Sequence, residues 1–514
     1  MRILSISTPA EVAWDKERLK LYLIHSGVIT EDEDFLLLKR SIDARHKVIK
    51  THLKLQVHRG TWKEVSFKPN YQDVRHSREV IIVGAGPAGI FAALKCLQLG
   101  IKPIVIERGK AIPRRRRDVA FINKKGEILP ESNYCFGEGG AGTFSDGKLY
   151  TRSHKRGHVQ EILNLLVYHG ADRDILVDAH PHIGTNKLPQ VIQNMRETIL
   201  EHGGEMWFES KVVDLIIENQ AVHGVILEDG TKVRADAVVL ATGHSARDIY
   251  ELLYQKGIKI VAKPLAMGIR IEHPQVLIDQ MQYHCHERPH YLPPAAYSWV
   301  QQIEGRGVYS FCMCPGGIIA PCATNSNEIV TNGWSPSRRN NPYSNSGIVV
   351  ELQIEDIPEP FSKYGNFAFL EFQKYIENQA FIAGNGRLKA PAQRLVDFTQ
   401  SKFSSDLPKC SYFPGLTCSN LREWLPKVIS EKLVKAFLKI SQKMKPYFTN
   451  EAVVVGVETR TSAPVRIPRN PTTGEHVQIQ NLYPCGEGAG YAGGIVSAAL
   501  DGQKIIQLIR SKWS

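Results

Sequence analysis

A glycine-rich turn between an apolar strand and a helix constrains this 514-residue chain more than any other feature. Residues 79–83 form a mainly apolar run, which is typical of a strand buried on both faces of a parallel sheet. Gly84, Gly86 and Gly89 follow directly, and the pattern then predicts a helix and a second strand at 102–107. This GxGxxG spacing within a strand–helix–strand unit is the fingerprint of dinucleotide binding, so the sequence predicts a Rossmann-like domain.

Each residue of the turn has an expected role. Gly84 permits the tight turn, Gly86 lets the backbone approach a pyrophosphate, and Gly89 lets helix and strand pack closely. Pro87 and Ala88 lie at the start of the helix, whose N-terminus faces the phosphates. We therefore expect all five residues to bind a dinucleotide.

An acidic residue completes this fingerprint. Glu107 ends the second strand, 18 residues after Gly89, where a carboxylate can accept hydrogen bonds from both ribose hydroxyls. Arg108 follows it and is also expected to contact the cofactor.

Three further segments favour FAD over NAD(P) as the dinucleotide. Residues 241–243 follow a buried strand and a predicted β-meander. Residues 482–487 form another strand that ends in glycine and an acidic residue, and a last helix begins near residue 493.

In these segments the chain resembles the two-dinucleotide-binding-domain flavoprotein superfamily. The resemblance implies that Glu107 holds the adenosine ribose and that Glu487 contacts the ribityl chain or the phosphates. It also implies that Gly493, Gly494 and Ile495 lie at the isoalloxazine end. The other residues expected to contact FAD in these segments are Val213, Thr242, Gly243 and Gly486.

A second glycine-rich segment, residues 137–148, sharpens the resemblance. Together with residues 40–45, 182–185, 241–248 and 458–466, it is similar to a bacterial family called FAD-dependent or NAD(FAD)-utilizing dehydrogenase. The resemblance covers nearly the whole chain and specifies the cofactor, not the substrate.

The segment 137–148 also has a physical interpretation. A loop this rich in glycine can press its backbone against a flat ring, and its amides and hydroxyls can serve flavin or phosphate atoms. An ordinary flexible loop is the alternative. The expected contacts are Gly140, Gly142, Thr143, Ser145, Asp146 and Gly147. Of the arginine run 114–117, the family resemblance implies that Arg115 reaches the FAD phosphates, while the others are expected to be solvated.

The chain divides into four predicted segments. Residues 1–75 form a small α+β domain of βαββ type, and residues 76–262 form the first part of the FAD-binding domain, with its meander. Residues 263–450 form an inserted mixed substrate or cap domain, and residues 451–514 complete the FAD-binding domain. The predicted fold class is therefore α/β with α+β additions.

Four residues are candidates for catalysis. FAD supplies the hydride chemistry, so the protein must position a substrate and manage a proton. His182 is a candidate general acid, although its context favours a histidine that only hydrogen-bonds the backbone. Arg270, Glu458 and Arg460 follow or end strands of the presumed active-site wall, where an arginine could clamp a carboxylate. An interdomain salt bridge is the alternative for these three.

The nine cysteines exclude some classes of function. Their spacing is irregular and contains no CxxC, so neither a disulfide scaffold nor a metal site is predicted. No Cys-x₄-Cys pair follows the first strand–helix–strand unit, which disfavours a reductase with a dithiol beside the flavin. Cys312 and Cys314 form the closest pair. No second fingerprint occurs mid-chain, so NAD(P)H, if used, would bind transiently at the flavin.

The charge and composition leave three hypotheses open. A net charge of +12 suits a nucleotide cofactor, an anionic substrate or RNA. The first hypothesis is an FAD-dependent oxidoreductase acting on a small molecule; the others are an RNA-modifying flavoprotein and a non-catalytic flavin-fold binding protein. Lys and Arg are not concentrated in one domain, which disfavours a nucleic-acid partner. No long apolar run or secretory signal occurs, so we expect a cytoplasmic protein without a membrane partner.

Overall fold

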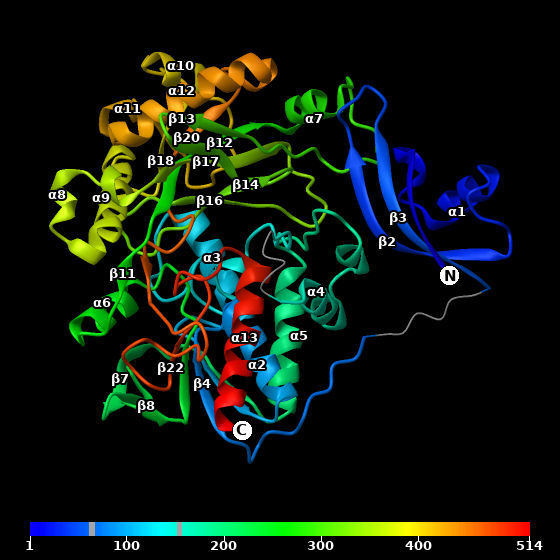
Figure 1. Cartoon of the computed structure of the whole chain (residues 1–514). Coiled ribbons are helices and arrows are strands. Elements are labelled where there is room, and N and C mark those ends of the chain that lie inside the picture. The colour runs from blue at the N-terminus through cyan, green and yellow to red at the C-terminus, as the bar shows by residue number, and fades with distance from the viewer. Residues whose placement is uncertain (61–66, 152–156) are drawn as a thin grey trace.

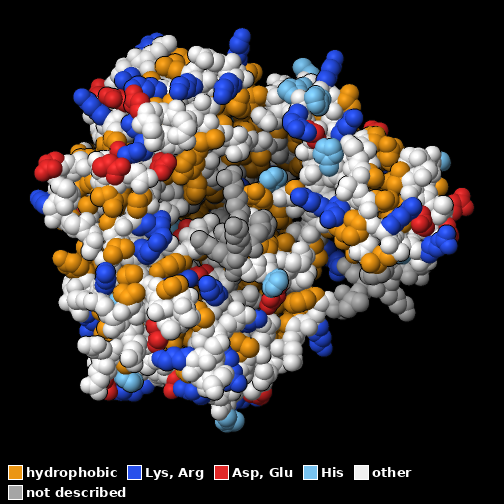
Figure 2. Space-filling model, in the orientation of Figure 1, with side chains coloured by type: hydrophobic (Ala, Val, Ile, Leu, Met, Phe, Trp, Pro, Cys, Tyr) orange, Lys and Arg blue, Asp and Glu red, His pale blue; other side chains and the backbone are white. Residues whose placement is uncertain are grey.

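The computed structural model describes residues 1–60, 67–151 and 157–514. A parallel sheet with its helices forms one part of the molecule, and a larger, mostly antiparallel sheet forms a second part above it (Figure 1). The N-terminal unit lies at one side of both (Figures 1 and 2). The predicted α/β fold class with a Rossmann-like domain is confirmed.

The Rossmann-like domain is built on five parallel strands in the order β22-β10-β4-β5-β6. They are β4 (Glu79–Val83), β5 (Lys102–Ile106), β6 (Glu205–Trp207), β10 (Ala237–Leu240) and β22 (Leu482–Pro484). Because successive side chains of a strand point to opposite faces, Val80 and Ile82 pack against the helices on one face, and Ile81 packs beneath the meander on the other. Burial on both faces explains the continuous apolar runs.

Helices cover one face of this sheet and a meander covers the other. On the first face α2 and α13 lie side by side, with α5 next to them (Figure 1). The helices on this face are α2 (Pro87–Gln98), α4 (Val159–Tyr168), α5 (Leu188–Glu201) and α13 (Ile495–Trp513). The opposite face carries β7 (Val212–Glu218), β8 (Ala221–Leu227), β9 (Lys232–Arg234) and α6 (Arg247–Gln255). Helix α3 (Ile112–Lys125) follows β5.

The second sheet has seven strands in the order β13-β14-β17-β12-β20-β18-β19. They are β12 (Leu265–Pro274), β13 (Val300–Ile303), β14 (Arg306–Cys314), β17 (Tyr343–Leu352), β18 (Ala390–Arg394), β19 (Leu416–Cys418) and β20 (Val453–Glu458). All neighbours are antiparallel except β18 and β19. Strand β20 lies between β12 and β18, so this sheet extends beyond the boundary that we predicted at residue 450.

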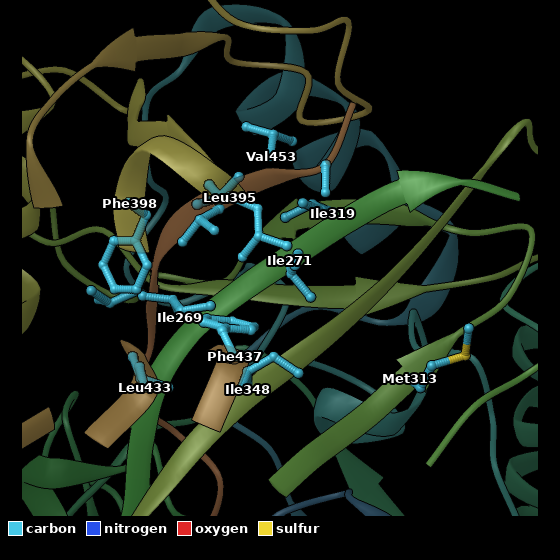
Figure 3. Packing of buried hydrophobic residues seen from close by; sticks show 14 of the residues in the cluster. Ile269, Ile271, Met313, Ile319, Ile348, Leu395, Phe398, Leu433, Phe437 and Val453 are labelled. Atoms are coloured by element: carbon cyan, nitrogen blue, oxygen red, sulfur yellow. The ribbon is translucent and has the colours of Figure 1, made fainter. Parts of the chain in front are cut away.

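A large apolar core lies between this sheet and its helices. Ile269 and Ile271 of β12 point toward Phe398 and Phe437 in Figure 3. The helices are α7 (Gln275–Tyr283), α8 (Glu359–Ser362), α9 (Ala368–Ala383), α10 (Leu395–Gln400), α11 (Leu421–Trp424) and α12 (Lys427–Lys443). The sequence pattern predicts one helix over 421–444, but Pro426 divides it into α11 and α12, because proline disfavours the helical conformation of the residue before it.

The N-terminal unit has the predicted βαββ order. It comprises β1 (Arg2–Pro9), α1 (Lys16–His25), β2 (Glu33–Asp43) and β3 (Lys50–Arg59), with β3 at the centre of the sheet. Arg40 of β2 attaches this unit to the rest of the molecule. Its backbone exchanges hydrogen bonds with Val177 and Ala179, and its guanidinium pairs with Asp178 at 2.8 Å and stacks on Trp14.

Two small ribbons complete the described strands. They are formed by β11 (Val261–Ala262) with β21 (Val465–Arg466) and by β15 (Ile318–Pro321) with β16 (Thr331–Trp334). Within the described residues, no helix has the length and apolar character needed to cross a bilayer.

Candidate flavin site

A cavity opens at the carboxyl ends of the parallel strands. The turns after β4, β5, β10 and β22 line it, together with the first turns of α2 and α13. The residues of these turns that we predicted to contact the cofactor and that line the cavity are Gly84, Gly86, Pro87, Ala88, Glu107, Arg108, Thr242, Gly243, Glu487, Gly494 and Ile495. Ligands of open α/β sheets bind at this edge. The structure thus brings three distant parts of the sequence to one site.

The three glycines of the first turn are required for different reasons. Gly84 has a φ of +107°, and a Cβ there would lie 2.5 Å from the Ala241 carbonyl oxygen. At Gly89 a Cβ would lie 1.9 Å from the Gly84 carbonyl oxygen, so this glycine permits the close packing of helix and strand. A Cβ on Gly86 would meet no protein atom closer than 3.9 Å, at Gly140. The space beside Gly86 therefore suits a bound group.

The Glu107 carboxylate is held by main-chain amides. Its Oε2 accepts a hydrogen bond from Ala85 at 2.9 Å, and its Oε1 accepts from Gly109 and Gly137, each at 2.9 Å. A carboxylate has about four lone-pair positions, so about one remains for a ribose hydroxyl. Glu107 therefore orients the glycine turn as well as facing the cavity, which the sequence pattern does not show.

Arg108 faces the cavity while bound to two carboxylates. Its Nε donates to Glu131 at 2.6 Å, its Nη1 donates to both carboxylate oxygens of Asp248 at 2.9 Å, and its guanidinium stacks on Phe136. These contacts hold the guanidinium in place at the β5 side of the cavity.

The expectation that Arg115 reaches the phosphates is corrected by the structure. Arg115 lies outside the cavity lining, is fully buried, and donates hydrogen bonds to the loop that follows α3. Its acceptors are the carbonyl oxygens of Asn133, Tyr134, Gly137 and Glu138 and the hydroxyl of Thr143. Burial lowers its pKa to about 10. Thr143, also expected at the cofactor, is buried and donates to Glu138, so both residues shape the loop from within.

The remaining predicted residues of this loop reach the cavity. They are Gly140, Gly142, Ser145, Asp146 and Gly147. The Asp146 carboxylate is buried and pairs with Arg339 at 2.8 Å. Burial raises its pKa, but the charges of Lys148 and then Arg339 lower it overall.

Two further predicted contacts lie beside the cavity. In β7 it is Val212 that lines the cavity, whereas Val213 is 40% exposed on the other face, because neighbouring strand residues alternate. Gly486 also lies outside the lining. Its amide donates to Asp501 at 2.8 Å, and a Cβ there would lie 2.8 Å from the Ala88 Cβ. Gly486 therefore allows the last strand to approach α2.

The start of α13 leaves open space at the cavity. Gly494 caps this helix with a φ of +125°, and Gly493 precedes it outside the lining. A Cβ on either residue would meet no protein atom within 4 Å. The open space at these two glycines and at Gly86 fits an extended cofactor lying between the two helix N-termini.

Glu487 and His244 face each other across the cavity wall. His244 Nε2 lies 4.0 Å from Glu487 Oε1, and the buried Nδ1 of His244 has no hydrogen-bond partner among the described residues. Burial raises the pKa of Glu487 to about 7, against the charge of Lys263. Burial and then the nearby Arg460 lower the pKa of His244 to about 4. The imidazole is therefore neutral at pH 7.

Two of the predicted catalytic residues are paired with each other. Arg270 Nε donates to Glu458 Oε2 at 2.8 Å, and both side chains are almost fully buried outside the cavity lining. Arg270 also donates to Asn332, which does line the cavity, at 3.3 Å. The prediction that Arg270 and Glu458 form the wall is corrected: neighbouring strands β12 and β20 place them behind it.

His182 also has a structural role. It lies outside the cavity lining, and its ring nitrogen Nε2 bonds to the Ser337 carbonyl oxygen at 3.2 Å. Burial and then Arg339 lower its pKa to about 4. The neighbouring residue Ile183 donates to Gly147, so this segment supports the glycine-rich loop. Of the two interpretations of His182, the structure therefore supports a histidine that hydrogen-bonds the backbone.

Arg460 reaches the cavity, but its donors are occupied. Its Nε and Nη2 bind the two carboxylate oxygens of Glu377 at 3.1 and 3.0 Å, and Nη2 also binds Glu328 at 2.8 Å. Its Nη1 donates to Ser245 and Thr324. The predicted carboxylate clamp thus exists, but it holds carboxylates of the protein itself.

The opposite wall contains residues that the predicted site omits. Phe311 and Cys312 of β14, Asn332 of β16 and Lys148 of the glycine-rich loop all line the cavity. Lys148 lies in a segment that the sequence singled out, and Cys312 belongs to the closest cysteine pair, whereas nothing local in the sequence points to Phe311 and Asn332. Within the described residues, no group of three or more His, Cys, Asp or Glu side chains is arranged to hold a metal ion.

Comparison with known families gives the cofactor. Residues 264–461 match a family described as FAD-dependent protein, C-terminal domain-like, and residues 145–288 match an FAD binding domain. Residues 1–58 match a domain of unknown function. An uncharacterized protein of Clostridium beijerinckii is 40% identical over 498 residues, which cover 93% of this chain and 92% of that protein.

The chain belongs to this family of FAD-dependent proteins. The family resemblance noted in the sequence is thereby confirmed, and the open, glycine-lined space between α2 and α13 fits its cofactor.

Two further relatives share only part of the chain. A tRNA uridine 5-carboxymethylaminomethyl modification enzyme of Myxococcus xanthus is 29% identical over 172 residues, 32% of this chain and 24% of that enzyme. A thiamine thiazole synthase of Aeropyrum pernix is 27% identical over 188 residues, 34% of this chain and 57% of that enzyme.

Proposed function

We propose that this protein is a cytoplasmic FAD-dependent oxidoreductase that transfers a hydride between flavin N5 and a small organic substrate. One observation carries the proposal: a single cavity is lined by the flavin-binding turns on one side and by polar residues of the second sheet on the other. Bound FAD supplies the hydride chemistry, while the protein supplies binding, orientation and proton transfer.

Residues of the cavity wall are proposed to contact the substrate and to carry the proton. Asn332 offers an amide to a substrate, and Phe311 offers an apolar surface beside it. His244 is the proposed proton carrier, because its neutral imidazole faces the cavity and its Nδ1 is unpartnered within the described chain. Arg460 positions Ser245, next to His244, through its hydrogen bond of 3.2 Å.

The proposed electron donor is NAD(P)H, bound transiently at the flavin. The test is spectroscopic: the purified protein is reconstituted with FAD, and NADH or NADPH is added without oxygen. We expect bleaching of the flavin absorbance by one of them. Colourless protein that cannot take up FAD would refute the cofactor, whereas bound flavin that neither donor bleaches would refute only the nicotinamide step.

His244→Asn tests the proton carrier in the same protein. Removing a general acid or base typically slows turnover by about 100-fold or more, while flavin content is retained. The control is His284→Asn, because His284 lies on α7's carboxyl end, outside the cavity lining. Equal substrate turnover by both variants would contradict the role of His244.

RNA modification is the second hypothesis from the sequence. On the face shown in Figure 2, Lys and Arg side chains are scattered among acidic and uncharged ones and form no continuous stripe. An electrophoretic mobility shift at physiological salt separates the hypotheses, since RNA binding that vanishes there is non-specific attraction.

The third hypothesis is a non-catalytic flavin-fold binding protein. Absence of turnover with a broad substrate panel, together with a stable protein partner, would favour this role.

A further inference from the structure

Two cysteines of β14 lie in an irregular stretch of strand, and the first of them faces the cavity. Cys312 lines the cavity and has a φ of +46°, a conformation uncommon for residues other than glycine. The pairing of β14 with β17 shifts between Phe311 and Cys314, which marks a β-bulge. Met313, between the two cysteines, packs in the core of the second sheet (Figure 3). Bulges often re-aim side chains beside active sites.

The bulge brings both thiols to one lysine. Lys148 Nζ lies 3.7 Å from Cys312 Sγ and 3.6 Å from Cys314 Sγ. Cys314 Sγ also donates to the Cys312 carbonyl oxygen at 3.3 Å. Arg270 Nη1 donates to the same carbonyl oxygen at 3.4 Å. Two thiols and two cations therefore form one cluster, of which Cys312 and Lys148 line the cavity.

This environment separates Cys312 from the other thiols. The neighbouring Cys314 thiol and the charges of Lys148 and Arg270 hold the pKa of Cys312 well below its ordinary value, against the opposing effect of burial. Burial instead raises the pKa of Cys96 and Cys485. The thiolate is the reactive form of cysteine, so Cys312 is the reactive member of a pair whose second thiol is adjacent.

We propose that Cys312 and Cys314 form a redox-active dithiol that exchanges two electrons with the flavin. The inference rests on the proposed flavin chemistry. In the oxidising direction, the Cys312 thiolate and the Cys314 thiol form an S–S bond while the S–H bond of Cys314 breaks. The two electrons and the one proton pass to oxidised FAD, which becomes the singly protonated, anionic reduced flavin. In the reverse direction reduced FAD cleaves the disulfide. Lys148 positions the thiolate and balances its charge.

A reductive titration counts the electrons. The FAD-loaded protein is oxidised with diamide, desalted, and titrated with dithionite without oxygen. Flavin and disulfide each take two electrons, so we expect about four per flavin for the wild type and about two for Cys312→Ser and Cys314→Ser. Cys418→Ser, on β19, is the matched control and should take up about four. Uptake of about two electrons by the wild type would overturn the proposal.

Alkylation provides a readout that needs neither a variant nor bound flavin. Diamide-treated and dithionite-reduced protein is alkylated with a maleimide, digested, and analysed by mass spectrometry. We expect Cys312 and Cys314 to be unalkylated after diamide, with the peptide that contains their disulfide two hydrogens lighter, and both residues to be alkylated after reduction. Two alkylated thiols after diamide would overturn the dithiol even in protein without FAD. If the peptide contains the disulfide but the protein takes up no FAD, the result would refute the flavin assignment and not the dithiol.

Discussion

The Glu107 carboxylate accepts a hydrogen bond of 2.9 Å from the Ala85 amide, which ties the end of β5 to the turn that follows β4. The same carboxylate binds Gly109 and Gly137, so one side chain connects the first glycine turn with the second glycine-rich loop. The acidic residue of the fingerprint thus has a structural role in addition to the ribose contact predicted for it.

Glu107→Gln should therefore weaken both the fold and cofactor binding. One oxygen becomes an NH₂ donor, which leaves at least one buried amide without an acceptor, at a cost of about 1–3 kcal/mol. We expect the free energy of unfolding of FAD-free protein to fall by this amount and the Kd for FAD to rise. Glu209→Gln, at an exposed ion pair with Arg114, is the control. An unchanged free energy of unfolding in urea would contradict the structural role of Glu107.

The two glycines Gly86 and Gly89 should respond differently to alanine. At Gly89 the Cβ would collide with main chain at 1.9 Å, so Gly89→Ala should destabilise the protein even without FAD. At Gly86 the Cβ meets no protein atom within 3.9 Å, and the alanine costs about 1 kcal/mol or less at this N-cap. Gly86→Ala should therefore fold normally and bind FAD at least about tenfold more weakly, a change of about 1.4 kcal/mol. Thermal unfolding and FAD titration of both variants measure this contrast.

The arginine run 114–117 contains its own control. Arg115→Met removes donors from buried carbonyl oxygens and should cost about 3–5 kcal/mol, as for other broken buried charge contacts. Arg116→Met changes an exposed side chain and should stay within about 0.5 kcal/mol. Urea unfolding of the two variants provides the comparison. Similar small losses for both would mean that the Arg115 hydrogen bonds contribute little.

Glu487 should make the stability of FAD-free protein depend on pH. Burial raises its pKa to about 7 in the folded state. The unfolded value is about 4.3, so between these pH values the folded protein binds more protons than the unfolded chain. The free energy of unfolding should therefore fall as pH rises through this window, relative to Glu487→Gln, and the difference should be constant above about pH 8. Urea unfolding at several pH values tests this; a difference independent of pH would contradict the raised pKa.

The sequence predicts the parts of the fold that depend on local rules. The turn with Gly84, Gly86 and Gly89 needs only its neighbouring strand and helix, and the structure places β4, α2 and β5 where the pattern predicts them. The burial of Arg115 could also be predicted from the sequence. Ile112, Arg115, Val119 and Ile122 recur at helical spacing and form the buried face of α3.

The far wall of the cavity depends on contacts that no local pattern encodes. Arg270 and Glu458 are 188 positions apart in the sequence and meet because β12 pairs with β20. Lys148 and Cys312 are 164 positions apart, and their approach requires the bulge in β14. Strand order and bulges result from packing of the whole sheet, so the spacing of these residues contains no sign of their proximity.

The attachment at Arg40 connects the N-terminal unit to the cavity through a path of backbone hydrogen bonds. The main chain at 177–179 is bonded to Arg40, and the residues that follow are bonded to the glycine-rich loop, through Leu149 with Pro181 and Gly184 with Asp146. Lys148 lies between these two bonds. The hydrogen bonds of Arg40 thus lie only a few residues along the chain from the hydrogen bonds that hold the backbone on both sides of this lysine.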